Sequence, residues 1–309
     1  MLKLIIYILL FLVLFGLIAL IWSKRKYQSS KSVANSYDSW TNDGILEKLW
    51  GEHVHLGFYE HGAIKKDFRK AKIDFVHQLV SWSGLSDLPK GSRVLDVGCG
   101  IGGSARILAK DYGFDVLGIS ISPAQVKRAN QLNPKGILCR FEVMDALDLK
   151  LEKGSFDAVW SVEAGPHMPN KQLYADEMLR VLRPGGVLAV ADWNKSEKNP
   201  KNYNILEKII MRQLLDQWSH PEFSSINSFR KNLLDSPFCG SNVEAEDWTL
   251  FTIPSWIDSI LEGIRRPAVF IKLGPLSLLK SIREIPTILM MNWAFSNKLM
   301  RFGVFKSRG

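Results

Sequence analysis

A glycine-rich loop where a strand passes into a helix constrains the fold of this chain more than any other feature. The loop lies within the run Val94-Leu95-Asp96-Val97-Gly98-Cys99-Gly100-Ile101-Gly102-Gly103. Glycines at such a junction let the backbone turn tightly and approach a ligand closely, at the edge where open α/β sheets bind cofactors. We therefore predict an α/β fold that binds a cofactor at Gly98, Gly100 and Gly102.

Strand and helix patterns alternate around this loop, and their order predicts a parallel, doubly wound sheet. The expected strands are Arg93–Val97, Asp115–Ile119, Leu138–Val143, Phe156–Val162 and Val187–Ala191, and the expected helices are Asp67–Trp82, Gly103–Lys110, Pro123–Leu132 and Lys171–Leu182. Residues 27–45 are polar and typical of a linker, and the pattern beyond Asn194 is helical. We expect an anchor at 1–23, a linker and lid at 24–66, a cofactor-binding core at 67–194 and a mostly helical region at 195–309.

Asp96 indicates which kind of cofactor the loop binds. The glycines alone also satisfy the dinucleotide pattern G-x-G-x-x-G, which needs an apolar strand end because a pyrophosphate repels a nearby carboxylate. A carboxylate two residues before the first glycine instead suits a ligand with an ammonium and a sulfonium group. The position therefore disfavours a nicotinamide dinucleotide.

The N-terminal segment predicts a membrane anchor. Leu2 to Trp22 are 21 residues with one charge, Lys3, near the start. A helix of that length rises about 30 Å, the thickness of the hydrocarbon core of a bilayer. The basic cluster Lys24-Arg25-Lys26 follows, which predicts that the rest of the chain lies on the cytoplasmic side. A cleaved signal peptide is the alternative, but small residues mark its cleavage site and none stand here.

The net charge of +9 is concentrated near the C-terminus. Residues 248–309 contain nine Lys and Arg against three acidic residues, together with eight aromatic residues. This mixture is typical of a membrane surface rather than a nucleic-acid groove. We predict contact with membrane lipid and no nucleic-acid partner. Cys99, Cys139 and Cys239 have no paired spacing, which indicates reduced thiols and no metal site.

The glycine loop resembles motif I of the class I methyltransferases, and further motifs agree. Ser155-Phe156-Asp157-Ala158-Val159-Trp160-Ser161 resembles their fourth strand, and Leu182-Arg183-Pro184-Gly185-Gly186 resembles their turn into the fifth. Four segments resemble the tocopherol and sterol methyltransferase branch, namely Trp160–Pro169, Tyr37-Asp38-x-Trp40, Trp50–Gly57 and Gln217-Trp218-Ser219-His220-Pro221. The resemblance covers nearly the whole chain.

The resemblance implies a Rossmann-like sheet and S-adenosyl-L-methionine as the methyl donor. Its strongest likeness is to cyanobacterial enzymes that methylate prenylated hydroquinones. It therefore implies C-methylation of the aromatic ring of 2-methyl-6-phytyl- or solanyl-1,4-benzoquinol, drawn from the bilayer, in tocopherol and plastoquinone biosynthesis. The implied location is a cyanobacterial plasma or thylakoid membrane.

The family pattern also implies the remaining cofactor-binding positions. An acidic residue usually ends the second strand and binds the ribose hydroxyls, but Ser120 stands there in this chain. The tocopherol and sterol branch uses a small hydroxyl or amide residue at that place, helped by a glutamine that corresponds to Gln125. Alternatively, Gln125 completes a capping box with Ser122. Asp145, after the third strand, is placed to meet the adenine amino group, or is an exposed loop aspartate.

Glu163 and His167 are the candidate catalytic residues. Both follow the fourth strand, so they should face the carboxyl edge of the sheet beside the transferred methyl group. Removing a phenolic proton helps to methylate a hydroquinone carbon, and a histidine with a pKa of about 6.5 suits that task. We predict His167 as the base and Glu163 as the group that orients it or lies near the sulfonium. The alternative is that His167 only shapes its loop.

The segment around His53 and His55 is expected to form a lid. The two histidines stand two residues apart without a third ligand, which is poor evidence for a metal site. We expect Tyr37, Trp50 and Tyr59 to close the lid with apolar surface.

The C-terminal region is expected to cover the acceptor pocket and contact the membrane. Trp218 and His220 either line that pocket or pack in the core. A helix from Pro254 is expected to carry Trp256, Ile257, Ile260, Leu261 and Ile264 on one face, and Ile285–Phe295 is too short to span a bilayer. Lys298, Arg301, Lys306 and Arg308 follow, and apolar faces beside basic clusters suit an element that lies in the membrane plane.

Three other functions stay open. A methyltransferase of the same branch with another acceptor is the first: γ-tocopherol, a sterol-like lipid or an amine. A membrane-anchored nicotinamide oxidoreductase is the second, and Asp96 and Ser120 both count against it. A non-catalytic cofactor-binding scaffold is the third, and the presence of both Glu163 and His167 disfavours it.

Overall fold

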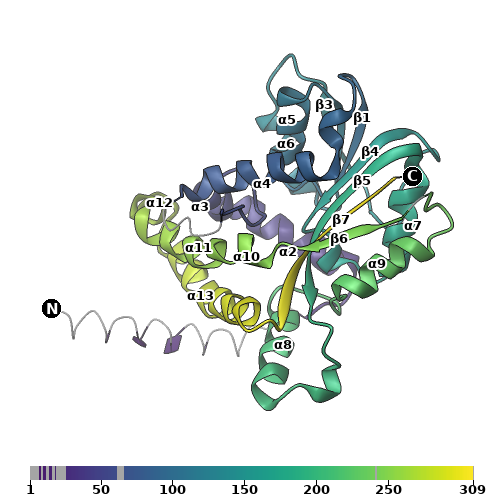
Figure 1. Cartoon of the computed structure of the whole chain (residues 1–309). Coiled ribbons are helices and arrows are strands. Elements are labelled where there is room, and N and C mark those ends of the chain that lie inside the picture. The colour runs from purple at the N-terminus through teal and green to yellow at the C-terminus, as the bar shows by residue number, and fades with distance from the viewer. Residues whose placement is uncertain are drawn as a thin grey trace.

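The computed structural model describes residues 26–60, 66–240 and 242–308, and six single positions nearer the N-terminus. Among these residues, seven strands form one sheet in the order β3-β2-β1-β4-β5-β7-β6 (Figure 1). The strands are β1 Arg93–Val97, β2 Asp115–Ser120, β3 Cys139–Val143, β4 Phe156–Val162, β5 Leu182–Lys195, β6 Glu244–Asp247 and β7 Met300–Arg308. The first five are parallel, and β7 pairs antiparallel with both β5 and β6.

The helices flank the sheet and extend beyond one end of it (Figure 1). They are α2 Ser30–Asp43, α3 Ile45–Trp50, α4 Phe68–Ser83, α5 Gly103–Asp111, α6 Pro123–Leu132, α7 Lys171–Val181, α8 Ile205–Gln217, α9 Ile226–Asp235, α10 Thr249–Thr252, α11 Pro254–Arg265, α12 Pro267–Leu273 and α13 Pro275–Ser296. Short 3₁₀ turns stand at Leu85–Asp87, Gly165–His167 (η2) and Pro200–Asn202.

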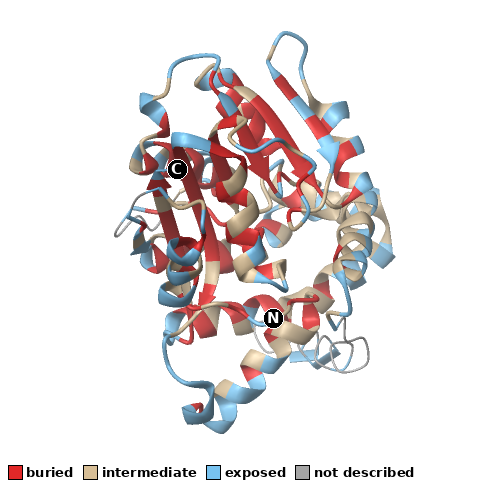
Figure 2. Cartoon of the chain, turned by 90° about the vertical axis from the view of Figure 1, so that its right-hand side faces the viewer, coloured by how far each residue is buried: buried red, intermediate tan, exposed pale blue. Residues whose placement is uncertain are grey.

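Alternate strand residues face two separate cores, because side chains along a strand point to opposite faces. Val94 of β1 and Ala158 of β4 lie in one core with α4, α5 and α6. Their neighbours Leu95 and Val159 lie in the other with α7 and α9. Strands buried on both faces read as continuous apolar runs, which is why the sequence located them. Figure 2 shows this burial along the sheet.

One antiparallel strand, β7, makes the prediction of a purely parallel sheet incomplete, and β6 adds a further strand beyond it. The basic tail, predicted to lie in the membrane plane, instead forms β7, in which Phe302, Val304 and Phe305 are fully buried. Two of its basic residues form ion pairs with β6: Arg301 with Asp247 at 2.9 Å, and Lys306 with Glu244 at 3.2 Å. This nine-residue strand mixes apolar and basic residues, and such a mixture also fits an amphipathic surface segment.

The polar segment 27–45 is not a linker, because most of it is helix α2. Its Ser and Asn residues have low helix propensity, so contacts outside the helix stabilise it. Val33 is buried, and α2 packs against α6. The apolar residues expected on one face of α11 extend from the core to the surface, since Trp256 is buried while Ile257 and Ile264 are exposed.

The predicted anchor Leu2–Trp22 lies outside the described residues, apart from Tyr7, Leu10, Phe11, Leu14, Phe15 and Ile18. In the part of the chain that the structure describes, no helix combines the length and apolar character needed to cross a membrane.

Candidate active site

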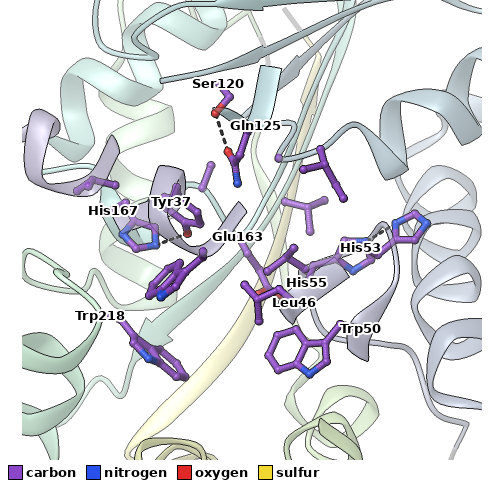
Figure 3. A pocket seen from close by; sticks show the side chains of 18 of the residues that line it. Tyr37, Leu46, Trp50, His53, His55, Ser120, Gln125, Glu163, His167 and Trp218 are labelled. Atoms are coloured by element: carbon purple, nitrogen blue, oxygen red, sulfur yellow. Dashed lines mark hydrogen bonds between the residues drawn. The ribbon is translucent and has the colours of Figure 1, made fainter. Parts of the chain in front are cut away.

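A cavity of about 810 Å³ lies at the carboxyl ends of β1, β2, β3 and β4. It extends from the glycine loop, past the end of β4, to helices α11, α12 and α13. Helices α2 and α3 and the segment 52–56 also line it (Figure 3). Its volume falls within the range of roughly 300–1,000 Å³ typical of small-molecule sites.

The glycine loop borders the cavity between β1 and α5. The amides of Gly98 and Cys99 both donate to the Ile119 carbonyl at 2.9 Å, which fixes the loop against the end of β2. At Gly100, where φ is +56°, a Cβ atom would have only the Gln125 Nε2 within 4 Å, at 3.9 Å. That side of the loop is therefore open to the cavity, which leaves room for a ligand close to the backbone.

Asp96, just before the loop, has a buried carboxylate oxygen that lacks a hydrogen-bond donor. It is 2% exposed, and its Oδ2 has no hydrogen-bond partner among the described residues. Burial raises its pKa to about 7, while the Ala105 amide acts in the opposite direction. A buried carboxylate oxygen without a partner is costly, and a cationic donor such as an ammonium group offsets that cost. The residues present therefore fit S-adenosylmethionine.

Ser120 and Gln125 bind each other at the second strand end. The Ser120 hydroxyl donates to Gln125 Oε1 at 2.7 Å, as Figure 3 shows. Only half of the proposed capping box forms, since Ser122 Oγ accepts from the Gln125 amide while the Ser122 amide donates to Ser120 Oγ. The Gln125 side chain is therefore not used as a cap. Binding of ribose by Gln125 stays a prediction. Binding of the cofactor by Gly102 also stays a prediction.

Asp145 borders the cavity in the loop after β3. Its Oδ1 accepts from the Leu147 amide at 2.9 Å, so the side chain also stabilises its own loop. Contact with adenine stays a prediction.

Glu163 lies in the wall of the cavity in a strained conformation. Its φ is +56°, the left-handed region that non-glycine residues rarely adopt and that recurs at functional sites. Its Oε1 accepts from the Leu56 amide at 2.7 Å. Burial raises its pKa to about 8, against the effects of the Leu56 amide and of Lys72. Neither ring nitrogen of His167 has a hydrogen bond to Glu163, so Glu163 does not orient it directly.

His167 is bonded to the lid instead. Its Nε2 and the Tyr37 hydroxyl are 2.7 Å apart, and its Nδ1 is buried with no partner among the described residues (Figure 3). Burial lowers its pKa to about 3, and Lys171 adds to the shift. The imidazole is therefore neutral at physiological pH. The sequence-based view of a histidine with an unperturbed pKa does not hold here.

The lid segment 51–57 rests on the start of α5 and on a buried lysine. A Cβ at Gly103 would lie 2.5 Å from the Glu52 carbonyl oxygen and 2.8 Å from His53 Nδ1, so only glycine permits this approach. Lys72 is 1% exposed, donates to the His53 carbonyl at 2.7 Å and lies over the Trp50 and Phe68 rings. The sequence did not predict that Lys72 is buried, because only the apolar residues of α4 were assigned to its buried face.

His53 and His55 bond to each other, with Nδ1 and Nε2 3.2 Å apart. Burial lowers the pKa of both rings. Both line the cavity, as do Tyr37 and Trp50, whereas Tyr59 is buried elsewhere and donates to Asp258 at 2.8 Å. The first four residues therefore line the cavity and Tyr59 does not, while their action as a lid stays a prediction.

Aromatic side chains form the part of the cavity wall farther from the glycine loop. Trp218 and His220 line it, together with Trp193 and Trp256. The rings of Trp193 and Trp256 are 5.3 Å apart, and those of Trp218 and Trp256 are 6.3 Å apart. Sequence reasoning missed the role of Trp193, although its place two residues beyond Ala191, near the carboxyl end of β5, was a usable signal.

Comparison with known proteins agrees with this geometry. Residues 95–190 match a family described as a methyltransferase domain. The chain is 56% identical to 2-methyl-6-phytyl-1,4-hydroquinone methyltransferase of Synechocystis, over 92% of this chain and 89% of that protein. It is 32% identical to a chloroplastic tocopherol O-methyltransferase of Arabidopsis thaliana, over 89% of this chain and 80% of that protein.

A solved structure shares the fold. A phosphoethanolamine N-methyltransferase of Haemonchus contortus, bound to S-adenosylhomocysteine, superposes with a TM-score of 0.73 at 15% identity, over 91% of this chain and 60% of that one. The chain therefore belongs to the S-adenosylmethionine-dependent class I methyltransferases, in the family that includes 2-methyl-6-phytyl-1,4-hydroquinone methyltransferase and the tocopherol methyltransferases.

Proposed function

We propose that this methyltransferase acts on a ring carbon of a prenylated hydroquinone, 2-methyl-6-phytyl- or solanyl-1,4-benzoquinol, in tocopherol and plastoquinone biosynthesis. The continuity of the cavity carries the proposal, because it joins the glycine loop to apolar side chains of α12 and α13 such as Phe270, Leu278 and Leu289. A ring placed beside the glycine loop would lay its prenyl tail against these residues. The relative at 56% identity, named for this substrate, supports the proposal.

The chemistry replaces the hydrogen on a ring carbon with a methyl group, so two protons need handling. The phenolic proton must leave to enrich the ring in electrons. After the new bond forms, the ring carbon loses its own proton and the oxygen regains one, so one proton is released overall and S-adenosylhomocysteine leaves. S-adenosylmethionine supplies the methyl group. Of the candidate catalytic residues, Glu163 has a pKa of about 8 and His167 one of about 3, so Glu163 is better suited to accept a proton near neutral pH. His167, held by Tyr37, acts as a neutral hydrogen-bonding group.

We propose further that the protein works on a membrane, anchored by Leu2–Trp22 with its catalytic part on the cytoplasmic side of a cyanobacterial plasma or thylakoid membrane. Exposed apolar side chains on α11–α13 support this, namely Ile257, Ile264, Ile271, Leu276, Leu278, Leu279 and Leu289. Basic residues stand among them, including Lys272 and Lys280. Protease protection in sealed vesicles of known orientation tests which side the catalytic part occupies. A catalytic part found on the non-cytoplasmic face contradicts the proposal.

Product analysis tests the reaction. The full chain is incubated with labelled S-adenosylmethionine and a panel of acceptors: prenylated hydroquinones with phytyl and solanyl tails, γ-tocopherol, a sterol and a secondary amine. We expect label on a ring carbon of the hydroquinones. Label on γ-tocopherol, the sterol or the amine, with none on the hydroquinones, contradicts the proposal in favour of another acceptor of the same branch. Family membership already excludes the oxidoreductase alternative.

A further inference from the structure

His220 is a buried histidine that the proposed reaction does not use. It is 4% exposed and lines the cavity. Neither ring nitrogen has a hydrogen-bond partner among the described residues, and the Pro166 carbonyl lies close enough to affect its pKa but outside hydrogen-bond geometry. A buried polar group without a partner is costly. The ring is therefore placed to bind a polar atom of a ligand.

Aromatic rings enclose His220 and fix its plane. It stacks on His167 with ring centroids 4.2 Å apart and an interplanar angle of 28°. Phe223 and Trp193 pack against it at 5.0 and 5.6 Å. Burial lowers its pKa well below the usual value, so the ring is neutral and offers one N–H donor and one nitrogen acceptor. A ring hydroxyl, which donates and accepts, matches this pair better than an ion does.

The residue before His220 has a strained backbone conformation, and the His220 ring faces the cavity. Ser219 has a φ of +55°, one of three non-glycine residues with positive φ among those described, and Glu163 is another. The His220 amide donates to the Leu215 carbonyl at 3.1 Å, which closes the turn at the end of α8. Trp218 and His220, on either side of Ser219, both line the cavity. Such strain is retained where the surrounding structure needs it, typically at binding sites.

We propose that His220 determines acceptor specificity by hydrogen bonding the second ring oxygen of the hydroquinone, the one para to the hydroxyl next to the methylated carbon. The inference rests on the proposed function. The first hydroxyl must lie near the methyl donor, on the Glu163 side of the cavity. The second then falls against the aromatic wall, where His220 supplies a free donor and acceptor between rings that stack on the acceptor.

The test compares two acceptors and two enzymes. The acceptors are a prenylated hydroquinone and the matching prenylated phenol that lacks the second hydroxyl, and the enzymes are the full-length wild type and His220→Phe. The wild type should prefer the hydroquinone by about 10- to 100-fold in kcat/KM, because the phenol leaves His220 unpaired. His220→Phe keeps the stacking on His167 but should lose that preference, with less than about a threefold change on the phenol.

Product structure gives an independent readout. If His220 fixes the orientation of the ring, NMR should find one methylated position with the wild type and a mixture of positions with His220→Phe. His220→Asn, which keeps a donor and an acceptor, should retain most of the preference and serves if the phenylalanine variant is insoluble. His77→Phe is the matched control, since His77 lies outside the cavity and bonds to Tyr112.

Two outcomes separate this inference from the function beneath it. An equal loss on both acceptors, with a single product position, means that His220 only packs, and it overturns the inference while the hydroquinone activity stands. A wild type that methylates neither ring acceptor overturns the proposed function itself.

Discussion

Burial shifts the pKa of each titratable side chain in the cavity. The resulting charges favour a cationic ligand. The pKa of Asp96 rises to about 7 and that of Glu163 to about 8, so both carboxyls are poised to ionise near neutral pH. The imidazoles of His55 and His167 have their pKa values lowered to about 3 and stay uncharged. No histidine cation then repels a sulfonium, and its approach favours the ionised form of each carboxyl.

We expect binding of S-adenosylmethionine to release protons and to tighten as pH rises from about 6 to 7.5. A cation binds the carboxylates better than the acids, so the carboxyl pKa values fall on binding and protons leave. The limit at 7.5 reflects the ligand's own amino group, whose pKa is about 8. Calorimetry in two buffers of different ionisation enthalpy counts the protons. Asp96→Asn should bind more weakly and release fewer, and a proton count unchanged by this substitution would contradict the assignment.

Glu163→Gln should lose more turnover than His167→Gln. Loss of a general base costs about 10²–10⁴ in rate, whereas loss of one neutral hydrogen bond costs about 10-fold. Single-turnover rates across pH 5–9 check this, and the wild-type rate should rise to a plateau below pH 8, because bound S-adenosylmethionine lowers the pKa of Glu163 from its free value of about 8. A rate that instead breaks near 6.5 and collapses in His167→Gln would restore the histidine as the base.

Among the elements, α2 lines the cavity and is joined to α6 by Asp38, to His167 by Tyr37 and to Lys280 by Asp43. Asp38 accepts from the Ser122 hydroxyl and from the Ala124 amide at the start of α6. Ion pairs join the same region to the rest of the molecule, between Glu47 and Arg128 and between Glu52 and Arg106. The lid is therefore attached to α5 and α6, the helices that begin on either side of the cofactor site.

Asp38→Ala should loosen the attachment of α2 to α6. Loss of the bonds at the α6 terminus costs about 1–2 kcal/mol of stability. We also expect S-adenosylmethionine to bind about tenfold more weakly, since α2 lines the cavity. Thermal denaturation and calorimetry measure the two effects. Asp148→Ala, in the exposed pair with Lys150, is the control and should change neither. A loss of stability without a loss of affinity would mean that α2 supports the fold alone.

Elements buried on both faces could be predicted from the sequence, and those stabilised by distant contacts could not. β1, β4 and α6 have their predicted bounds because apolar runs and a Ser-Pro start are local signals. β6 is only four residues, Glu244–Asp247, and is mostly exposed, so it leaves no pattern. From the carboxyl ends of the strands the sequence placed Asp96, Ser120, Glu163 and His167 at one site, and all four line the cavity, while their roles stay predictions. The pKa of His167 depends on what surrounds it, which a linear sequence does not show.

At the scale of the whole molecule, one cavity connects the cofactor loop to the helices that carry the exposed apolar residues. Its wall includes Ile260, Ile264 and Leu289, and the last two also lie partly on the outer surface. A lipid with a polar ring therefore has a route from α11–α13 to Glu163 without crossing the sheet. The same helices that cover the acceptor pocket are suited to contact the bilayer, so the two roles weighed from the sequence are compatible.

Placing charges on this surface should impair access to long-tailed acceptors alone. Ile271 and Leu276 are 82% and 72% exposed, and burying each in a bilayer is worth about 1.5–3 kcal/mol. In the full chain, Ile271→Asp with Leu276→Asp should lower activity on a phytyl hydroquinone in anionic vesicles by about tenfold or more. Activity on a short-tailed, water-soluble analogue should stay within about twofold, because the cavity is unchanged.

The control is Leu138→Asp. Leu138 is 63% exposed just before β3, at the amino ends of the parallel strands, whereas the cavity lies at their carboxyl ends. It should affect neither acceptor. Raising the salt concentration should lower the activity of the wild type on vesicles, because exposed basic residues such as Lys272 contribute about 1 kcal/mol each near anionic lipid. If the double variant loses both activities equally, the helices only support the fold. If it loses neither, the substrate reaches the cavity by another route.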